Sequence, residues 1–260
     1  MKVANDFFSP ALFVTYRFIS GTIVLLAVAI FLHLPLPPKK FRFWIILTGI
    51  LQIAFCSVAM QACFQYLSAG LVAMLNYTMP IWVTLLARFF LNESLTAQKI
   101  IGVIISIVGI SILMNADITG NIYAILLALS AAIVWAVSNI IMKWKLAGCD
   151  PIPMTTWQMV AGAVSLTVYT FLFDDFTNVQ WTPLSIACVL YNGILASALA
   201  YFLWFHILSH MQASKASVSI LGVPVVGVIS GIICLNETLT LTMTIGMFLI
   251  LFGIVLVQKS

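Results

Sequence analysis

Eight amide and aromatic side chains lie within or at the ends of long apolar stretches of this sequence. A carboxamide donates and accepts hydrogen bonds and an aromatic ring offers an apolar face, so such groups suit a cavity that binds a small, partly polar solute. They can equally serve hydrogen bonds between helices or a belt of aromatic residues at the membrane surface. The candidates for a solute cavity are Gln61, Asn76, Tyr77, Trp135, Asn139, Gln158, Tyr201 and Trp204.

One charged side chain, Arg17, lies well inside an apolar stretch. A guanidinium group in that position could bind the carboxylate of a solute. It also lies only a few helical turns from the start of its stretch, so it could instead extend to the membrane surface.

All seven acidic residues fall in loops or at the ends of the apolar stretches. A proton-coupled transporter usually needs an ionisable relay inside the membrane, so these positions favour a neutral or zwitterionic solute, moved by facilitated diffusion or exchange. The histidine pair His206 and His210 has no acidic partner for a metal ion, and no cysteine belongs to a CxxC pair. Nucleotide-binding, zinc-protease and serine-hydrolase motifs do not occur either. We therefore expect no enzyme activity, no cofactor and no metal.

The composition shows what must position these side chains. The chain is 63% hydrophobic and 7% charged, whereas soluble domains carry about 25% charged residues. Its apolar stretches are continuous rather than alternating, which predicts helices rather than a barrel. The sequence thus predicts an all-α polytopic protein of the plasma membrane, with the lipid bilayer as its partner. The predicted spans are 10–32, 43–65, 70–91, 97–115, 121–143, 153–173, 184–207, 213–235 and 241–258.

Basic residues of the short loops indicate the orientation of the spans. If the loop with Lys39, Lys40 and Arg42 is cytoplasmic, each later span crosses once and the remaining basic residues after Arg17 fall on the same side. The net charge of +4 is not gathered into a basic cluster, so no nucleic-acid partner is expected. The acidic residues of the opposite side are Asp117, Asp174, Asp175 and Glu237.

Two nearly identical turns, LNESLT at 91–96 and LNETLT at 235–240, mark an internal repeat with an offset of 144 residues. Five predicted spans separate the turns, and an odd number of crossings places them on opposite sides of the membrane. This is an inverted-topology repeat, which is widely used in secondary transporters. The offset aligns four further pairs: Ala69 with Ala213, Pro80 with Pro224, Gly102 with Gly246, and Gly109 with Gly253.

The alignment extends toward the N-terminus with an offset of 141, which pairs Arg17 with Gln158 and Gly21 with Gly162. The first repeat, 1–115, then holds four predicted helices and the second, 121–260, holds five. The counterpart of the helix 121–143 would lie before residue 1. We therefore interpret the fold as an inverted repeat of five-helix units in which four plus five helices are present.

The repeated prolines and glutamates each allow two interpretations. Pro80 and Pro224 lie within spans, where a proline bends a helix, and the bend can be either a hinge for alternating access or a static feature. Glu93 and Glu237 can gate opposite ends of a pathway. They can also bind free backbone N–H groups where the next helix begins, beside N-caps at Thr96 and Thr240.

The inverted plan, the Leu-Asn-Glu turn before the last helix of each half, the proline ahead of it and the paired glycines after it resemble the EamA-type branch of the drug/metabolite transporter superfamily. The resemblance covers essentially the whole chain. It implies ten helices, a central cavity between the halves, and export of small-molecule metabolites such as amino acids. The alternative is a non-transporting assembly or sensor protein built on a truncated transporter fold.

Overall fold

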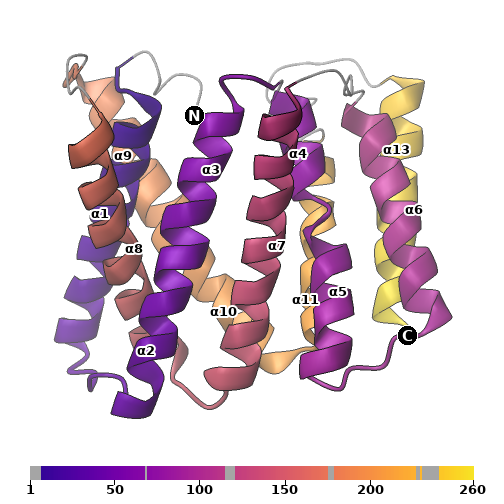
Figure 1. Ribbon diagram of the computed structural model, residues 1–260, viewed down its shortest axis with the longest axis horizontal. Coiled ribbons are helices and arrows are strands. Elements are labelled where there is room, and N and C mark those ends of the chain that lie inside the picture. The colour runs from indigo at the N-terminus through magenta and orange to yellow at the C-terminus, as the bar shows by residue number, and fades with distance from the viewer. Residues whose placement is uncertain (1–6, 68, 115–120, 175–178, 227–228, 230–239) are drawn as a thin grey trace. The chain divides into compact units, whose positions relative to one another are not determined.

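Side-chain caps fix where two of the long helices begin. The structure is a computed structural model, and it describes residues 7–67, 69–114, 121–174, 179–226, 229 and 240–260 (Figure 1). Ser9 caps helix α1 (Pro10–Phe31) and Asp150 caps helix α8 (Pro151–Phe173), each accepting a hydrogen bond from a backbone N–H of the first turn. A proline follows each cap, where its missing N–H costs no helical hydrogen bond.

All regular secondary structure of the described residues is helical, which confirms the all-α prediction. Seven helical segments of the described chain are long and apolar enough to cross a membrane, and Ala97–Leu113 and Ala213–Val226 are shorter apolar helices. Each predicted span overlaps one of these segments. The remaining elements are α2 (Lys39–Thr48), η2 (Gly49–Phe55), α3 (Cys56–Cys63), α4 (Ala69–Asn76), α5 (Met79–Phe90), α6 (Ala97–Met114), α7 (Ile122–Lys145), α9 (Pro183–Gly193), η3 (Ile194–Leu199), α10 (Ala200–His210), α11 (Ala213–Ser219), η4 (Ile220–Gly222) and α13 (Leu241–Gln258).

The two spans that contain the repeated prolines are interrupted just ahead of them. α4 ends at Asn76 and α5 begins at Met79, because Pro80 has no N–H to bond the carbonyl of Asn76. In the second repeat the 3₁₀ turn η4 occupies the equivalent place ahead of Pro224. The span predicted over 70–91 is confirmed as Leu71–Phe90, with the bend at Pro80 that a proline causes. The hinge role of the two prolines stays a prediction.

Two other spans change helix type in their middle. η2 and η3 are π-helices, where the sequence predicted continuous α-helices over 43–65 and 184–207. η2 begins at Gly49, and η3 follows Gly193, which lies 144 residues further along the chain. The two π-helices therefore occupy equivalent places in the two repeats. Such insertions are rare and occur frequently at functional sites.

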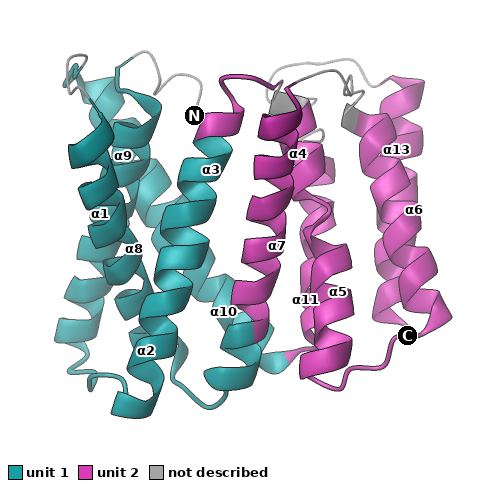
Figure 2. Ribbon diagram, viewed as in Figure 1, with its two compact units in different colours: residues 1–61, 141–210 teal, residues 62–140, 211–260 magenta. Residues whose placement is uncertain are grey.

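The chain forms two compact units, which differ from the two sequence repeats (Figure 2). Unit 1 comprises residues 1–61 and 141–210, and unit 2 comprises residues 62–140 and 211–260. Each unit therefore takes its helices from both repeats. A helix of one repeat packs within its unit on helices of the other repeat, as the following contacts show.

Unit 1 is held together by two equivalent helix crossings. α1 packs on α8 and on α9 with η3, and α8 packs in turn on α2 with η2. A Cβ added to Gly21 would lie 2.5 Å from the carbonyl oxygen of Gly193, and one added to Gly162 would lie 3.2 Å from that of Gly49. Gly162 is the repeat counterpart of Gly21, and Gly49 is that of Gly193, so the two contacts are equivalent under the repeat. Small residues thus bring each pair of backbones into direct contact.

Unit 2 contains a similarly close pair, α6 and α13, which lie side by side in Figure 1. A Cβ on Gly102 would lie 2.7 Å from the carbonyl oxygen of Gly253, and one on Gly109 would lie 2.8 Å from that of Gly246. Gly102 thus faces Gly253, the repeat counterpart of Gly109, and Gly109 faces Gly246, the repeat counterpart of Gly102. The interface is self-complementary, as in a two-fold dimer, although both helices belong to one chain.

Candidate solute site

Arg17 turns toward the π-helix η3 within unit 1. Its Nε donates a hydrogen bond to Ser197 Oγ (2.5 Å) and its Nη2 donates to the carbonyl oxygen of Ala196 (3.1 Å). The guanidinium carbon lies 5.1 Å from the centre of the Phe18 ring. The side chain is therefore held at a fixed place among neutral groups.

Gln158, the repeat counterpart of Arg17, binds the other π-helix. It is fully buried, and its Nε2 donates a hydrogen bond to Oε1 of Gln52 (3.2 Å), which lies in η2. Its Nε2 also lies 3.7 Å from the sulfur of Met142. The oxygen Oε1 of Gln158 has no hydrogen-bond partner among the described residues. A buried acceptor of this kind is costly unless a solute or water molecule binds it.

The contacts of Arg17 and Gln158 are equivalent under the repeat. Ala196 lies 144 residues after Gln52, so each polar side chain reaches the same position in the π-helix of the other repeat. Sequence reasoning missed Gln52, Ala196 and Ser197. The signal that could have found them is the spacing of 144 between Gly49 and Gly193, because it marks two equivalent close crossings next to the aligned Arg17 and Gln158.

The charge of Arg17 is not balanced within the part of the chain that the structure describes. No described carboxylate lies within ion-pair distance of its guanidinium group, and its Nη1 donates to no described acceptor. A charge inside a membrane is costly unless an opposite charge accompanies it. A carboxylate bound here would supply that charge and accept strong, charge-assisted hydrogen bonds.

Three further cavity candidates belong to unit 1. Tyr201 is half-buried on α10, directly after η3, and its ring lies 6.0 Å from that of Phe18 in an edge-to-face arrangement. The guanidinium of Arg17 lies over the same Phe18 ring, so Tyr201 and Arg17 both contact one aromatic side chain. Gln61 and Trp204 are half-buried on α3 and α10, and their place in a solute cavity stays a prediction.

The other four candidates belong to unit 2. Asn76 and Tyr77 lie at the break between α4 and α5, and Tyr77 packs against the core that α6, α11 and α13 share. Trp135 and Asn139 are one turn apart on α7, and the side chain of Asn139 is fully buried. That these residues line one cavity with those of unit 1 stays a prediction.

Glu93, in the turn after α5, caps a helix of the other repeat. Its carboxylate accepts hydrogen bonds from the backbone N–H groups of Ala213 (2.6 Å) and Ser214 (3.2 Å) at the start of α11. One of the two interpretations of Glu93 was that it binds backbone N–H groups of the next helix, α6; the structure instead places the contact at α11. Thr96 already caps α6, accepting a bond of 3.2 Å from a backbone N–H, and Thr240 caps α13 in the same way.

Next to this cap, the fully buried Lys99 donates from Nζ to Oε1 of Gln212 (3.0 Å), the residue that precedes α11. Glu93 also interacts electrostatically with Lys99. The turn of the first repeat and the start of α11 thus form one polar network. Glu237, the counterpart of Glu93, lies outside the described residues.

Replacing Glu93 by Ala is expected to lower the free energy of unfolding by about 1–2 kcal/mol, the usual cost of a lost N-cap. Thermal unfolding of the purified protein measures the loss. Ser94→Ala, in the same turn, is the control, because Ser94 is exposed and makes no hydrogen bond in the described structure. If Glu93→Ala leaves the unfolding temperature unchanged but stops solute flux, Glu93 is a gate rather than a cap.

The histidine pair lies within one turn of α10. His210 Nδ1 lies 2.8 Å from the carbonyl oxygen of His206, and the two rings are 4.4 Å apart. No group of three potential metal ligands occurs among the described residues.

The apolar helices identify the chain as a multi-pass membrane protein, and several of its spans contain buried polar side chains. Comparison with known families makes the class specific. The EamA-like transporter family matches residues 1–115 and 122–258, and the chain belongs to this family.

Several relatives carry transporter names. The uncharacterized transporter YoaV of Bacillus subtilis is 30% identical over 98% of this chain and 89% of its own length. An uncharacterized transporter of Archaeoglobus fulgidus is 31% identical over 100% and 92%. The probable amino-acid metabolite efflux pump of Salmonella typhimurium is 25% identical over 79% and 71%. A solved crystal structure shares the fold, with a TM-score of 0.86 at 16% identity over 99% of this chain and 90% of its own.

Proposed function

We propose that this protein is a secondary transporter of the plasma membrane that exports small neutral or zwitterionic metabolites bearing a carboxylate, such as amino acids, by alternating access. The observation that carries the proposal is that no described carboxylate lies within ion-pair distance of Arg17, which is held against η3 within a predicted span. The efflux pump of Salmonella, a relative of 25% identity, supports the class of solute.

The buried polar groups support a zwitterionic rather than an anionic solute. The guanidinium of Arg17 offers donors to a carboxylate, whereas the oxygen Oε1 of Gln158 offers an acceptor for an N–H group. We propose that the solute carries both a carboxylate for Arg17 and an ammonium group for Oε1 of Gln158. Because no acidic residue lies within a predicted span, we propose exchange or facilitated diffusion without proton coupling.

Counterflow into liposomes that contain the purified, full-length protein tests the proposal. We expect at least one amino acid of a panel to exchange, and its analogue without the carboxylate to exchange roughly tenfold or more slowly, the effect of one charged hydrogen bond. Dissipating a proton gradient should leave the exchange unchanged. Equal exchange of the analogue would remove the role of Arg17. Absence of exchange from folded protein would favour an assembly or sensor protein.

A further inference from the structure

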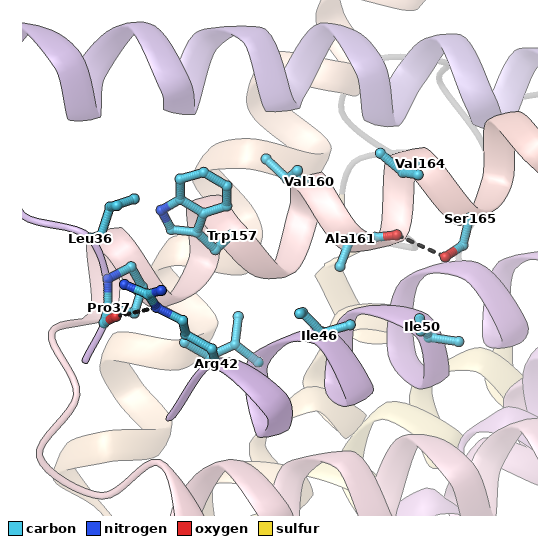
Figure 3. A pocket seen from close by; sticks show the side chains of 11 residues that line it. Leu36, Pro37, Arg42, Ile46, Ile50, Trp157, Val160, Ala161, Val164 and Ser165 are labelled. Carbon is cyan, nitrogen blue, oxygen red and sulfur yellow. Dashed lines mark hydrogen bonds between the residues drawn. The ribbon is translucent and has the colours of Figure 1, made fainter. Parts of the chain in front are cut away.

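Unit 1 contains a groove on its α2 and α8 helices (Figure 3). It has a volume of about 460 Å³, within the range of roughly 300–1,000 Å³ of small-molecule sites. α2, the loop before it, the start of η2 and α8 form its walls. Neither Arg17 nor Gln158, nor any of the eight predicted cavity residues, lines it.

The long part of the groove is apolar and open to the surroundings of unit 1. Ile46, Ile50 and Val164 line it, and these residues are 50%, 41% and 58% exposed. Ser165, the one hydroxyl in the lining, donates its hydrogen bond to the carbonyl oxygen of Ala161 in its own helix (2.8 Å). The walls thus offer dispersion contacts and almost no hydrogen bonds, which suits a hydrocarbon chain.

One end of the groove is cationic. Figure 3 shows Arg42 beside Leu36 and Pro37, away from the end that Ile50 and Ser165 occupy. Arg42 lies in the first turn of α2, and its Nε donates a hydrogen bond to the carbonyl oxygen of Pro37 (3.0 Å). Its two terminal nitrogens donate to no acceptor in the described chain, so they can bind an anion.

The charge of this end also indicates the membrane leaflet. The exposed Lys39 and Lys40 precede Arg42 at the start of α2, and such basic loops lie on the cytoplasmic side. Anionic lipids give that surface its negative potential, which attracts basic residues near the membrane. The groove therefore presents a cation at the level of lipid head groups and an apolar channel running from it along two membrane-spanning helices.

We propose that this groove binds one anionic phospholipid of the cytoplasmic leaflet, with its phosphate on Arg42 and an acyl chain between α2 and α8. A transported metabolite fits the groove poorly, because beyond Arg42 the lining offers only the indole N–H of Trp157 and the Ser165 hydroxyl, whose proton is already donated within α8. The site stands independently of the solute that the protein transports, so each proposal can fail without the other.

Native mass spectrometry of the purified full-length protein, with phosphatidylglycerol and phosphatidylcholine added in turn, tests this site. We expect a phosphatidylglycerol adduct that survives delipidation and no equivalent phosphatidylcholine adduct. Arg42→Gln should weaken the adduct about fivefold, the effect of one basic residue near an anionic membrane surface. Arg88→Gln removes another exposed arginine, at the end of α5, and should leave the adduct unchanged.

A second pair of variants tests the apolar part of the groove. Val164→Trp should fill the groove and remove the adduct, whereas Val168→Trp should keep it, since Val168 lies one turn away on α8, is 54% exposed and does not line the groove. Equal retention of both lipids, or an adduct that survives both Arg42→Gln and Val164→Trp, would overturn the proposal.

Discussion

Replacing Arg17 by Gln is expected to reduce export of a carboxylate solute by roughly 10- to 100-fold, the effect of a lost charged hydrogen bond. The folded protein should survive the change. Gln158 occupies the equivalent position of the second repeat, and its carboxamide already donates a hydrogen bond to a π-helix in that setting. A glutamine at residue 17 can bind Ala196 or Ser197 in the same way while removing the positive charge.

Counterflow and thermal unfolding, measured on the same preparations, separate the loss of charge from a loss of fold. Arg88→Gln is the matched control, since it removes an exposed arginine outside unit 1. Arg17→Lys should retain part of the exchange, because an ammonium group keeps the charge but not the planar geometry of the guanidinium. Normal exchange by Arg17→Gln would show that Arg17 serves only to hold α1 against η3.

The length of the apolar stretches predicted the membrane-spanning helical segments of the described residues, because about 20 apolar residues are needed to cross a bilayer. The bounds differ by a few residues. α2 begins at Lys39 rather than 43, directly after the loop proline Pro38, and α10 continues to His210 rather than 207. These end residues are polar or charged, and an amphipathic helix end leaves the hydrocarbon region without losing its backbone hydrogen bonds.

Contacts between the repeats were not predictable from hydrophobicity. Hydrophobicity does not distinguish an α-helix from a π-helix, so the π-helices η2 and η3 were not predicted. The partner of Glu93 was not predicted either. Capping rules consider only the next helix in the chain, whereas α5 packs on α11 and Glu93 therefore reaches the start of α11. The repeat itself held the missing information. Gly49 and Gly193 share its offset of 144, and small residues at equivalent places indicate equivalent helix crossings.

Adding a single methyl group at Gly193 is expected to disturb both the crossing of α1 with α9 and the position of Arg17. A Cβ there would collide with Ser20 Oγ and would lie 2.6 Å from the carbonyl oxygen of Arg17, a backbone atom that cannot rotate away. Overpacking of this kind costs roughly 1–3 kcal/mol. Gly193→Ala should therefore lower the unfolding temperature by several degrees and reduce exchange, since α1 must move away from η3.

Gly49→Ala should have a similar cost, because a Cβ at Gly49 would collide with the carbonyl oxygen of Gln158 in the equivalent crossing. Gly222→Ala is the control, as the nearest neighbour of its added Cβ, the Cδ1 of Ile254, would be 3.7 Å away. Thermal unfolding of the three variants decides the matter. If Gly193→Ala and Gly49→Ala unfold at the wild-type temperature, the backbones are not in the close contact that holds each polar side chain against a π-helix. The two glycine crossings would then make no measurable contribution to the stability of unit 1.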